Sequence, residues 1–303
     1  MAGPFAPHSA PALRRPAVEG AFYPADPAEL DALIDGCVAE AAPLVARAGR
    51  AAASGRDLAG VLVPHAGLVY SGVVAAAGWL AVRASEPDVV VLLGTNHGAA
   101  WLDGVGAWET GAWQTPSGRT MIDEPTATAI LALGPPFTVD RAAHLGEHSI
   151  EVQLPFLGRL LPNARIVPLA VSAGVGQPAR EAGRRLGGLL GRQRGAGRRI
   201  VIAISSDMAH YPVDGVCRRV TRDLLPSLER IRPEALAATE RRVVADGRPS
   251  VVCGMCGIEP AVLGLAALEA MGATGGVTLA AATSADVGGP ADRTVGYLAM
   301  SFR

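Results

Sequence analysis

Several absences narrow the range of proteins to which this 303-residue chain can belong. The chain has no lysine, because all 27 of its basic residues are arginine, and its formal net charge is only −1. No basic stripe stands out, so nucleic acid is not an expected partner. Four cysteines are too few for a disulfide-stapled scaffold. No segment follows the Gly-x-x-x-x-Gly-Lys-Ser/Thr pattern of a phosphate-binding loop.

Long hydrophobic runs are also missing, with one exception. Residues 58–82 contain no charged side chain and are long enough to raise the question of a membrane span. Pro64, Gly67 and Gly72 interrupt this run, so a strand, a loop and a helix are the better interpretation, and no membrane contact is expected. Residues 1–16 are rich in Ala and Pro and lack the apolar centre of a secretion signal. We therefore expect a loose tail over 1–16 and a cytoplasmic protein.

What the sequence does contain is a repeated arrangement of a buried strand followed by a polar loop. The strands are predicted at 61–63, 88–94 and 199–204, and the loops after them carry His65, His97, and the pair Asp207 and His210. Strands separated by helices indicate parallel pairing, which brings their carboxyl ends to one edge of the sheet. Open α/β sheets bind ligands at that edge. We expect His65 and His97 to meet there.

Asp207 and His210 have two interpretations. As an ionisable pair beside a ligand cleft, they would serve as a catalytic acid–base pair, with His210 moving a proton. Alternatively, Ser205, Ser206 and Asp207 satisfy the amides of a turn and a helix cap, and His210 stacks in the core beside Tyr211.

The pair Cys253 and Cys256 forms a Cys-x-x-Cys motif. A zinc knuckle would need a second such pair, and a thioredoxin-like site would need a different context. Cys256 precedes a predicted helix, whose N-terminus favours a thiolate and so a metal ligand. We therefore separate Cys256, as a ligand, from Cys253.

A third polar cluster comprises Glu147, His148 and Glu151. It has the composition of a metal site, but the acidic first turn of a capped helix gives the same pattern. We assign Glu147 and His148, together with Tyr70 in the loop after His65, to positions that support the ligands or face a substrate.

Together these segments resemble the Memo family, called AmmeMemoRadiSam system protein B in bacteria and archaea. The matching motifs, in chain order, are Pro64-His65-Ala66-Gly67 with Tyr70-Ser71-Gly72, Gly94-x-x-His97, Glu147-His148-Ser149-x-Glu151, Ser205-Ser206-Asp207-x-x-His210 and Cys256-Gly257-x-x-Pro260. The resemblance runs from about residue 21 to the C-terminus. It implies one α/β domain over 17–303, with a central mostly parallel or mixed sheet flanked by helices, similar to class III extradiol dioxygenases.

The resemblance also implies a metal site formed by His65, His97 and Cys256. Iron is the first expectation, with copper or zinc as alternatives. The dioxygenases use a carboxylate where this chain has Cys256, so ring cleavage does not follow from the likeness. An AMMECR1-like protein and a radical SAM enzyme are the implied partners. Two functions remain open: a metal-dependent oxidoreductase acting on a small molecule or a partner protein, or a non-catalytic metal-binding or interaction module.

Overall fold

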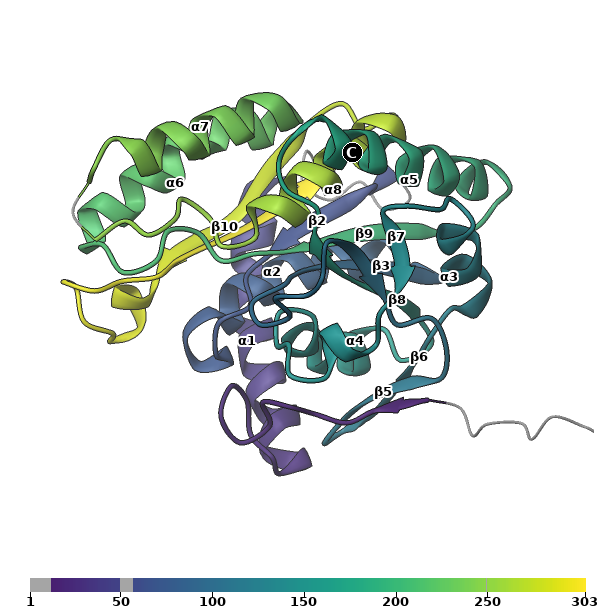
Figure 1. Cartoon of the computed structure of the whole chain (residues 1–303). Helices are drawn as coiled ribbons and strands as arrows, with labels where there is room; N and C mark the ends of the chain where they lie inside the picture. The colour runs from purple at the N-terminus through teal and green to yellow at the C-terminus, as the bar shows by residue number, and fades with distance from the viewer. Residues whose placement is uncertain (1–11, 50–56, 249) are drawn as a thin grey trace, which may run out of the picture.

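The structure is a computed structural model that describes residues 12–49, 57–248 and 250–303. A large mixed β-sheet of eight strands forms its centre, and helices cover both faces of this sheet (Figure 1). The prediction of an α/β domain with a mixed sheet flanked by helices is confirmed.

Four parallel strands form the middle of the sheet. In spatial order they are β2 (Gly60–Val63), β9 (Ile200–Ser205), β3 (Val89–Thr95) and β8 (Arg165–Ser172). Every residue of the first three strands is buried. A parallel sheet covered on both faces requires such continuous apolar runs, which is why these three strands could be predicted from the sequence.

Antiparallel pairing enters on both sides of this parallel core. On one side, β11 (Gly296–Phe302) pairs with β2, and β10 (Gly276–Thr283) pairs with β11. On the other, β4 (Gly104–Ala107) runs antiparallel to β8, and β7 (Phe137–Val139) completes the edge. The full order is β10-β11-β2-β9-β3-β8-β4-β7.

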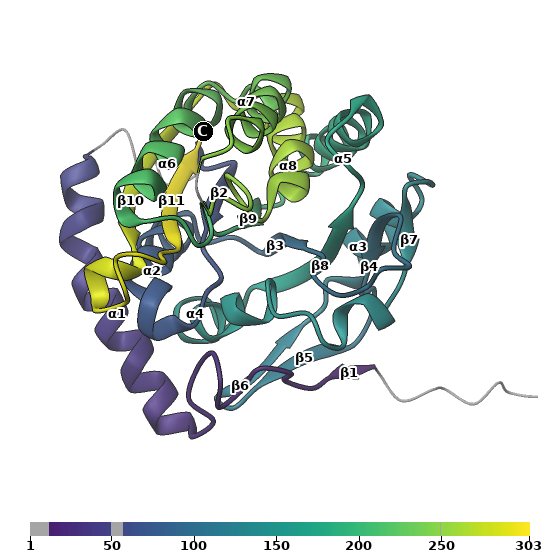
Figure 2. The same ribbon diagram turned by 60° about the vertical axis from the view of Figure 1, so that its left-hand side comes forward.

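The helices form two layers, as Figure 2 shows. One layer contains α1 (Pro27–Ala48), α2 (Leu68–Ser85) and α4 (Leu154–Leu160), which contact one another. The opposite layer contains α5 (Gln177–Gly195), α6 (Asp214–Glu229), α7 (Pro233–Ala245) and α8 (Ile258–Ala270), and α3 (Glu124–Leu131) lies near β7. Among the helices of the described ranges, α2 is the one long and apolar enough to cross a membrane, but 67% of it is buried inside the protein. It is a core helix.

The start of the chain corrects one prediction. Residues 1–11 of the expected tail lie outside the described residues, but 12–16 do not form a loose segment. Leu13–Arg14 make a short strand, β1, that pairs in parallel with β5 (Ala112–Thr115), which in turn pairs with β6 (Gly118–Met121). Arg14 is fully buried.

Candidate metal centre

Three strand exits meet at the carboxyl edge of the parallel core. The rings of His65 and His97, which follow β2 and β3, lie 5.3 Å apart between centroids and at 89° to each other. The expectation that both histidines occupy the same edge is confirmed. Cys256, on the loop that leads into α8, brings its Sγ to 3.1 Å from Nε2 of His65. Asp207, after β9, lies beside the same histidine.

Two triplets of side chains have the arrangement of metal ligands, and they share His65. In the first triplet, His65, His97 and His148 place ligand atoms within 4.8 Å of one another, and in the second, His65, Asp207 and Cys256 do so. Of the three ligands inferred from the resemblance, His65 belongs to both triplets, His97 only to the first and Cys256 only to the second. The structure also brings His148 into ligand range, although we had given it a supporting role.

A relay of hydrogen bonds through the core fixes the tautomer of His65. Trp79 on α2 donates from Nε1 to Oε1 of Gln153, so Nε2 of Gln153 must be the donor that reaches the Ser205 hydroxyl. Ser205 itself donates to the carbonyl of Ser149. Its lone pairs then accept from Gln153 and from Nδ1 of His65 at 3.0 Å. The proton of His65 therefore lies on Nδ1, and Nε2 is left with a lone pair for an ion.

His97 is held in the same way by Glu147. The carboxylate accepts from Nδ1 of His97 at 2.9 Å and from its backbone amide at 2.7 Å. It also accepts from the amides of His148 and Ser149. Burial alone would raise the pKa of Glu147, but the hydrogen bonds from His97 and these amides outweigh burial and hold the pKa at about 2. An ionised carboxylate only accepts, so Nδ1 of His97 carries the proton and Nε2 is free to ligate.

His65 stays neutral at physiological pH. Its pKa is lowered to about 4, mainly by burial, with a smaller lowering from the nearby His148 and His97, while the charge of Asp207 opposes the shift. Because a metal binds the neutral imidazole, no proton has to be removed from His65 before an ion binds.

The structure supports the loop-holding role of Asp207, and the acid–base role of Asp207 and His210 stays a prediction. One carboxylate oxygen of Asp207 accepts from the amides of His65 and Ala66, so it does hold the loop. Its other oxygen lies 3.6 Å from Nε2 of His210, too far for a hydrogen bond. The ring of His210 also contacts Tyr211. Its Nε2 is buried and has no hydrogen-bond partner among the described residues.

The environment of Cys256 corrects another prediction. Burial, and after it the charge of Asp207, raises the pKa of this thiol well above its ordinary value. The single S–H of this thiol faces two acceptors, Nε2 of His65 at 3.1 Å and the carbonyl of Asp207 at 3.7 Å. The expected thiolate at the helix N-terminus is wrong for the metal-free protein, because Gly257, not Cys256, caps α8, and burial outweighs the helix dipole. An ion would have to displace the proton.

A cavity lies beside His97. A cavity of about 270 Å³ is lined by His97, Glu147, Ala143 and Trp101, whose indole is 64% exposed. Tyr70 lies on the first turn of α2 after the His65 loop and is half exposed.

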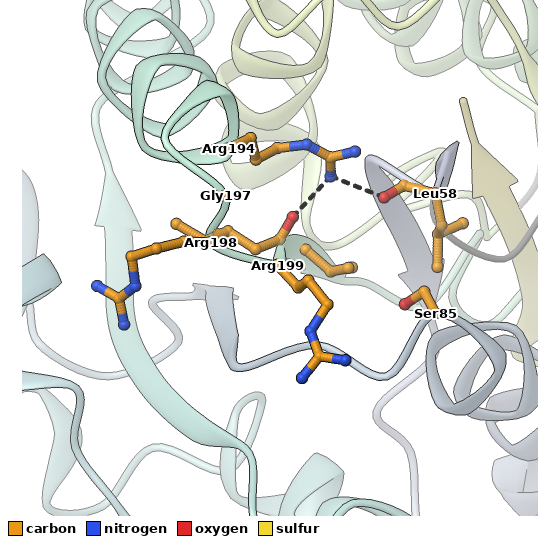
Figure 3. Close-up of a pocket in the computed structure, with 8 residues that line it drawn as sticks. Leu58, Ser85, Arg194, Gly197, Arg198 and Arg199 are labelled. Carbon is orange, nitrogen blue, oxygen red and sulfur yellow. Dashed lines mark hydrogen bonds between the residues drawn. The ribbon is translucent and has the colours of Figure 1, made fainter.

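A second cavity of about 200 Å³ lies at the opposite, amino edge of the sheet and is lined by arginines (Figure 3). Arg194 donates to the carbonyls of Leu58 and Ile200. Arg198 and Arg199 extend away from each other and bind Asp123 and Asp88, respectively. Arg194 is half-buried and supports the backbone.

The donors at the carboxyl edge fit a transition-metal ion. Imidazole nitrogens and a thiol suit iron, copper or zinc, whereas Mg²⁺ and Ca²⁺ prefer oxygen ligands. The fold and the cleft define this protein as an α/β domain with a candidate metal centre at its strand exits.

Comparison with known proteins gives the family. A family model described as "Memo-like protein" matches residues 14–301. A MEMO1 family protein of Methanopyrus kandleri is 36% identical over 296 residues, covering 96% of this chain and 99% of the relative. One from Aquifex aeolicus is 35% identical over 294 residues, covering 96% and 99%. The chain therefore belongs to the Memo-like family. An uncharacterized Escherichia coli K12 protein has a TM-score of 0.49 at 14% identity, covering 80% of this chain and 99% of that one, a likeness too distant to carry an argument.

Proposed function

We propose that this protein binds one transition-metal ion at the carboxyl edge of its sheet and acts as an oxidoreductase on a small molecule or a partner protein. His65, His97 and Cys256 would hold the ion, with His148 and Asp207 within reach. The observation that carries the proposal is the orientation of His65 and His97. Each uses Nδ1 on the scaffold and leaves Nε2 to the cleft.

The bound ion would supply Lewis acidity or redox chemistry, with iron the first expectation and copper or zinc the alternatives. The protein's own residues would manage protons and space. Asp207 holds the His65 loop through two backbone amides, and His210 has an unused Nε2 with which to give or take a proton. The cavity beside His97 would admit the substrate without displacing a protein ligand.

The number of donors favours a second candidate, a metal-binding module without catalysis. If His148 and Asp207 join the three inferred ligands, the ion would be saturated by protein and no position would stay open. The two candidates differ in whether a small exogenous ligand can reach the ion.

Location and partners are further proposals. All four cysteines are free, as expected of a reducing cytoplasm, which we propose as the location. An AMMECR1-like protein and a radical SAM enzyme are proposed partners on the family resemblance alone.

The test is anaerobic purification followed by metal analysis and absorption spectra with and without O₂. We expect about one transition-metal ion per chain, retained by His210→Gln but lost from His65→Gln. Addition of azide should perturb the spectrum of an open site and leave a saturated site unchanged, which separates the two candidates. Wild-type protein that binds no Fe²⁺, Cu⁺ or Zn²⁺ would contradict both.

A further inference from the structure

A fully buried ion pair joins the N-terminal strand β1 to the segment that carries Glu147. The side chains of Arg14 and Glu151 have no solvent-exposed surface. The guanidinium also packs on Trp113, with 4.5 Å between its Cζ and the ring centroid. Burying two charges is expensive unless both are fully hydrogen-bonded, so the other contacts of the pair show what it does for the structure.

The other N–H groups of Arg14 donate to backbone carbonyls of the loop before Glu151. Its Nε and one terminal nitrogen donate to the carbonyl of His144 at 3.1 and 2.9 Å. The same terminal nitrogen donates to the carbonyl of Glu147 at 2.6 Å. The rigid planar fork of a guanidinium fixes these two carbonyls relative to each other, which a lysine ammonium on a flexible stem cannot do.

The carbonyl that Arg14 holds belongs to the same residue whose carboxylate holds His97. We propose that Arg14 is a positioning residue for the candidate metal centre. By fixing the backbone at Glu147, it aims the carboxylate at Nδ1 of His97 and keeps Nε2 of that ring directed at the ion. Partners of metal-ligating histidines usually change metal affinity about 10–100-fold when removed. The inference rests on the proposed function, since it assumes that His97 ligates.

The same cluster provides a matched control. The Tyr23 hydroxyl donates to Glu151 at 2.5 Å and, within the described residues, forms no hydrogen bond with the carbonyl of His144 or Glu147. Tyr23→Phe therefore weakens the ion-pair cluster without releasing the loop.

The experiment compares Arg14→Lys, Tyr23→Phe and wild type as full-length, metal-free proteins. Co²⁺ affinity is measured by absorption titration, Tm by calorimetry, and the His97 Nδ1–H resonance by NMR before any metal is added. We expect Arg14→Lys to weaken Co²⁺ binding about 10-fold and to shift or broaden the His97 resonance. Tyr23→Phe should lower Tm about as much as Arg14→Lys does, while its Co²⁺ affinity and its His97 resonance stay near those of wild type. If Arg14→Lys does not fold, Arg14→Gln takes its place, because it keeps one amide donor without the guanidinium fork, and Glu151 is left unchanged because it also accepts from the amides of Ala17 and Val18.

Unchanged Co²⁺ affinity and an unchanged resonance in the Arg14 variants would overturn the inference, as would equal losses in Tyr23→Phe. If wild type binds no Co²⁺, the proposed metal centre fails, and the His97 resonance, which needs no metal, still decides whether Arg14 positions that ring.

Discussion

The two edges of the parallel sheet both gather polar side chains beside a cavity, yet their polar groups are used differently. At the amino edge, the guanidinium groups of Arg194, Arg198 and Arg199 end on carbonyls and carboxylates of the scaffold. At the carboxyl edge, the scaffold uses only one nitrogen each of His65 and His97 and turns the other toward the cleft.

The comparison teaches that a cluster of polar residues becomes a candidate site when the protein forms hydrogen bonds with only some of the polar atoms of each side chain. A fully paired cluster stabilises the fold and has nothing left to offer a ligand. A half-paired cluster is held rigidly from behind and still presents lone pairs in front, which is how metal-ligating histidines are organised. The following substitutions test this difference between the edges.

The largest effect is expected at the histidine shared by both triplets. His65→Gln should reduce Co²⁺ or Zn²⁺ affinity by at least about 100-fold, more than loss of a supporting partner, because it removes a donor from either arrangement. Metal content after dialysis and an absorption titration measure this. Full metal retention by this variant would remove the basis of the comparison.

The next effect separates the two cysteines. Cys256→Ser should weaken binding of soft or borderline ions about 10–100-fold, because a hydroxyl replaces the thiol that lies 3.1 Å from Nε2 of His65. Cys253→Ser is the matched control and should keep wild-type affinity. Equal losses from both variants would indicate that the Cys-x-x-Cys pair works as a unit.

Glu147→Gln is expected to weaken metal binding about 10-fold, because an amide can no longer accept from Nδ1 of His97 and from the surrounding amides at once. Isothermal titration with Zn²⁺ measures the change. An affinity equal to that of wild type would show that His97 does not depend on this carboxylate.

Glu147 should also make the fold sensitive to acid. Its folded pKa, about 2, lies below the ordinary value of 4.5, so its contribution is fully present above pH 4.5 and is lost as the pH falls toward 2. The contribution is about 3 kcal/mol by linkage. Urea unfolding of metal-free protein between pH 6 and the acid limit should therefore be less pH-dependent in Glu147→Gln. Parallel curves for the two proteins would contradict this.

The smallest effect is expected at the amino edge. Arg199→Gln breaks ion pairs with Asp88 and Glu86 that are largely solvent-exposed, so the free energy of unfolding should change by less than about 1 kcal/mol. Metal affinity should be unchanged, because this edge lies at the other end of the strands. A loss of metal binding here would mean that the two edges are coupled.

The parallel core and the strand exits could be predicted because their signals are local. The apolar runs at 61–63 and 88–94 have the length and bounding residues of buried strands, and topology alone then brings His65 and His97 to one edge. Asp123 likewise follows from a local rule, since it caps α3 by accepting from the amide of Thr126.

The remaining features depend on contacts between distant segments. Arg14 carries no sign in the sequence that it pairs with Glu151, 137 positions later, so the sequence alone predicts a loose tail there. The prediction of a thiolate at Cys256 was wrong because burial raises the pKa of the thiol, and burial depends on the folded loop and cannot be read from the motif. The proximity of His148 to His65 and His97 could not be foreseen either, because His148 lies in the irregular stretch between two short 3₁₀ helices, Ala142–His144 and Glu151–Gln153.

The hydrogen bonds from Trp79 through Gln153 to Ser205 all run in one direction, with each group donating to the next. Each group donates or accepts according to the one before it, and the side-chain amide of Gln153 sets the sense of the chain. Gln153→Glu exchanges one donor for an acceptor. The Ser205 hydroxyl would then turn from the Ser149 carbonyl to the new carboxylate, and the Pro64 carbonyl would lose the hydrogen that Nε2 of Gln153 now donates to it. Ser205 would still accept from Nδ1 of His65, but the carbonyls of Ser149 and Pro64 would be left without their donors, so a change made in the hydrophobic core would destabilise the backbone that carries the cleft.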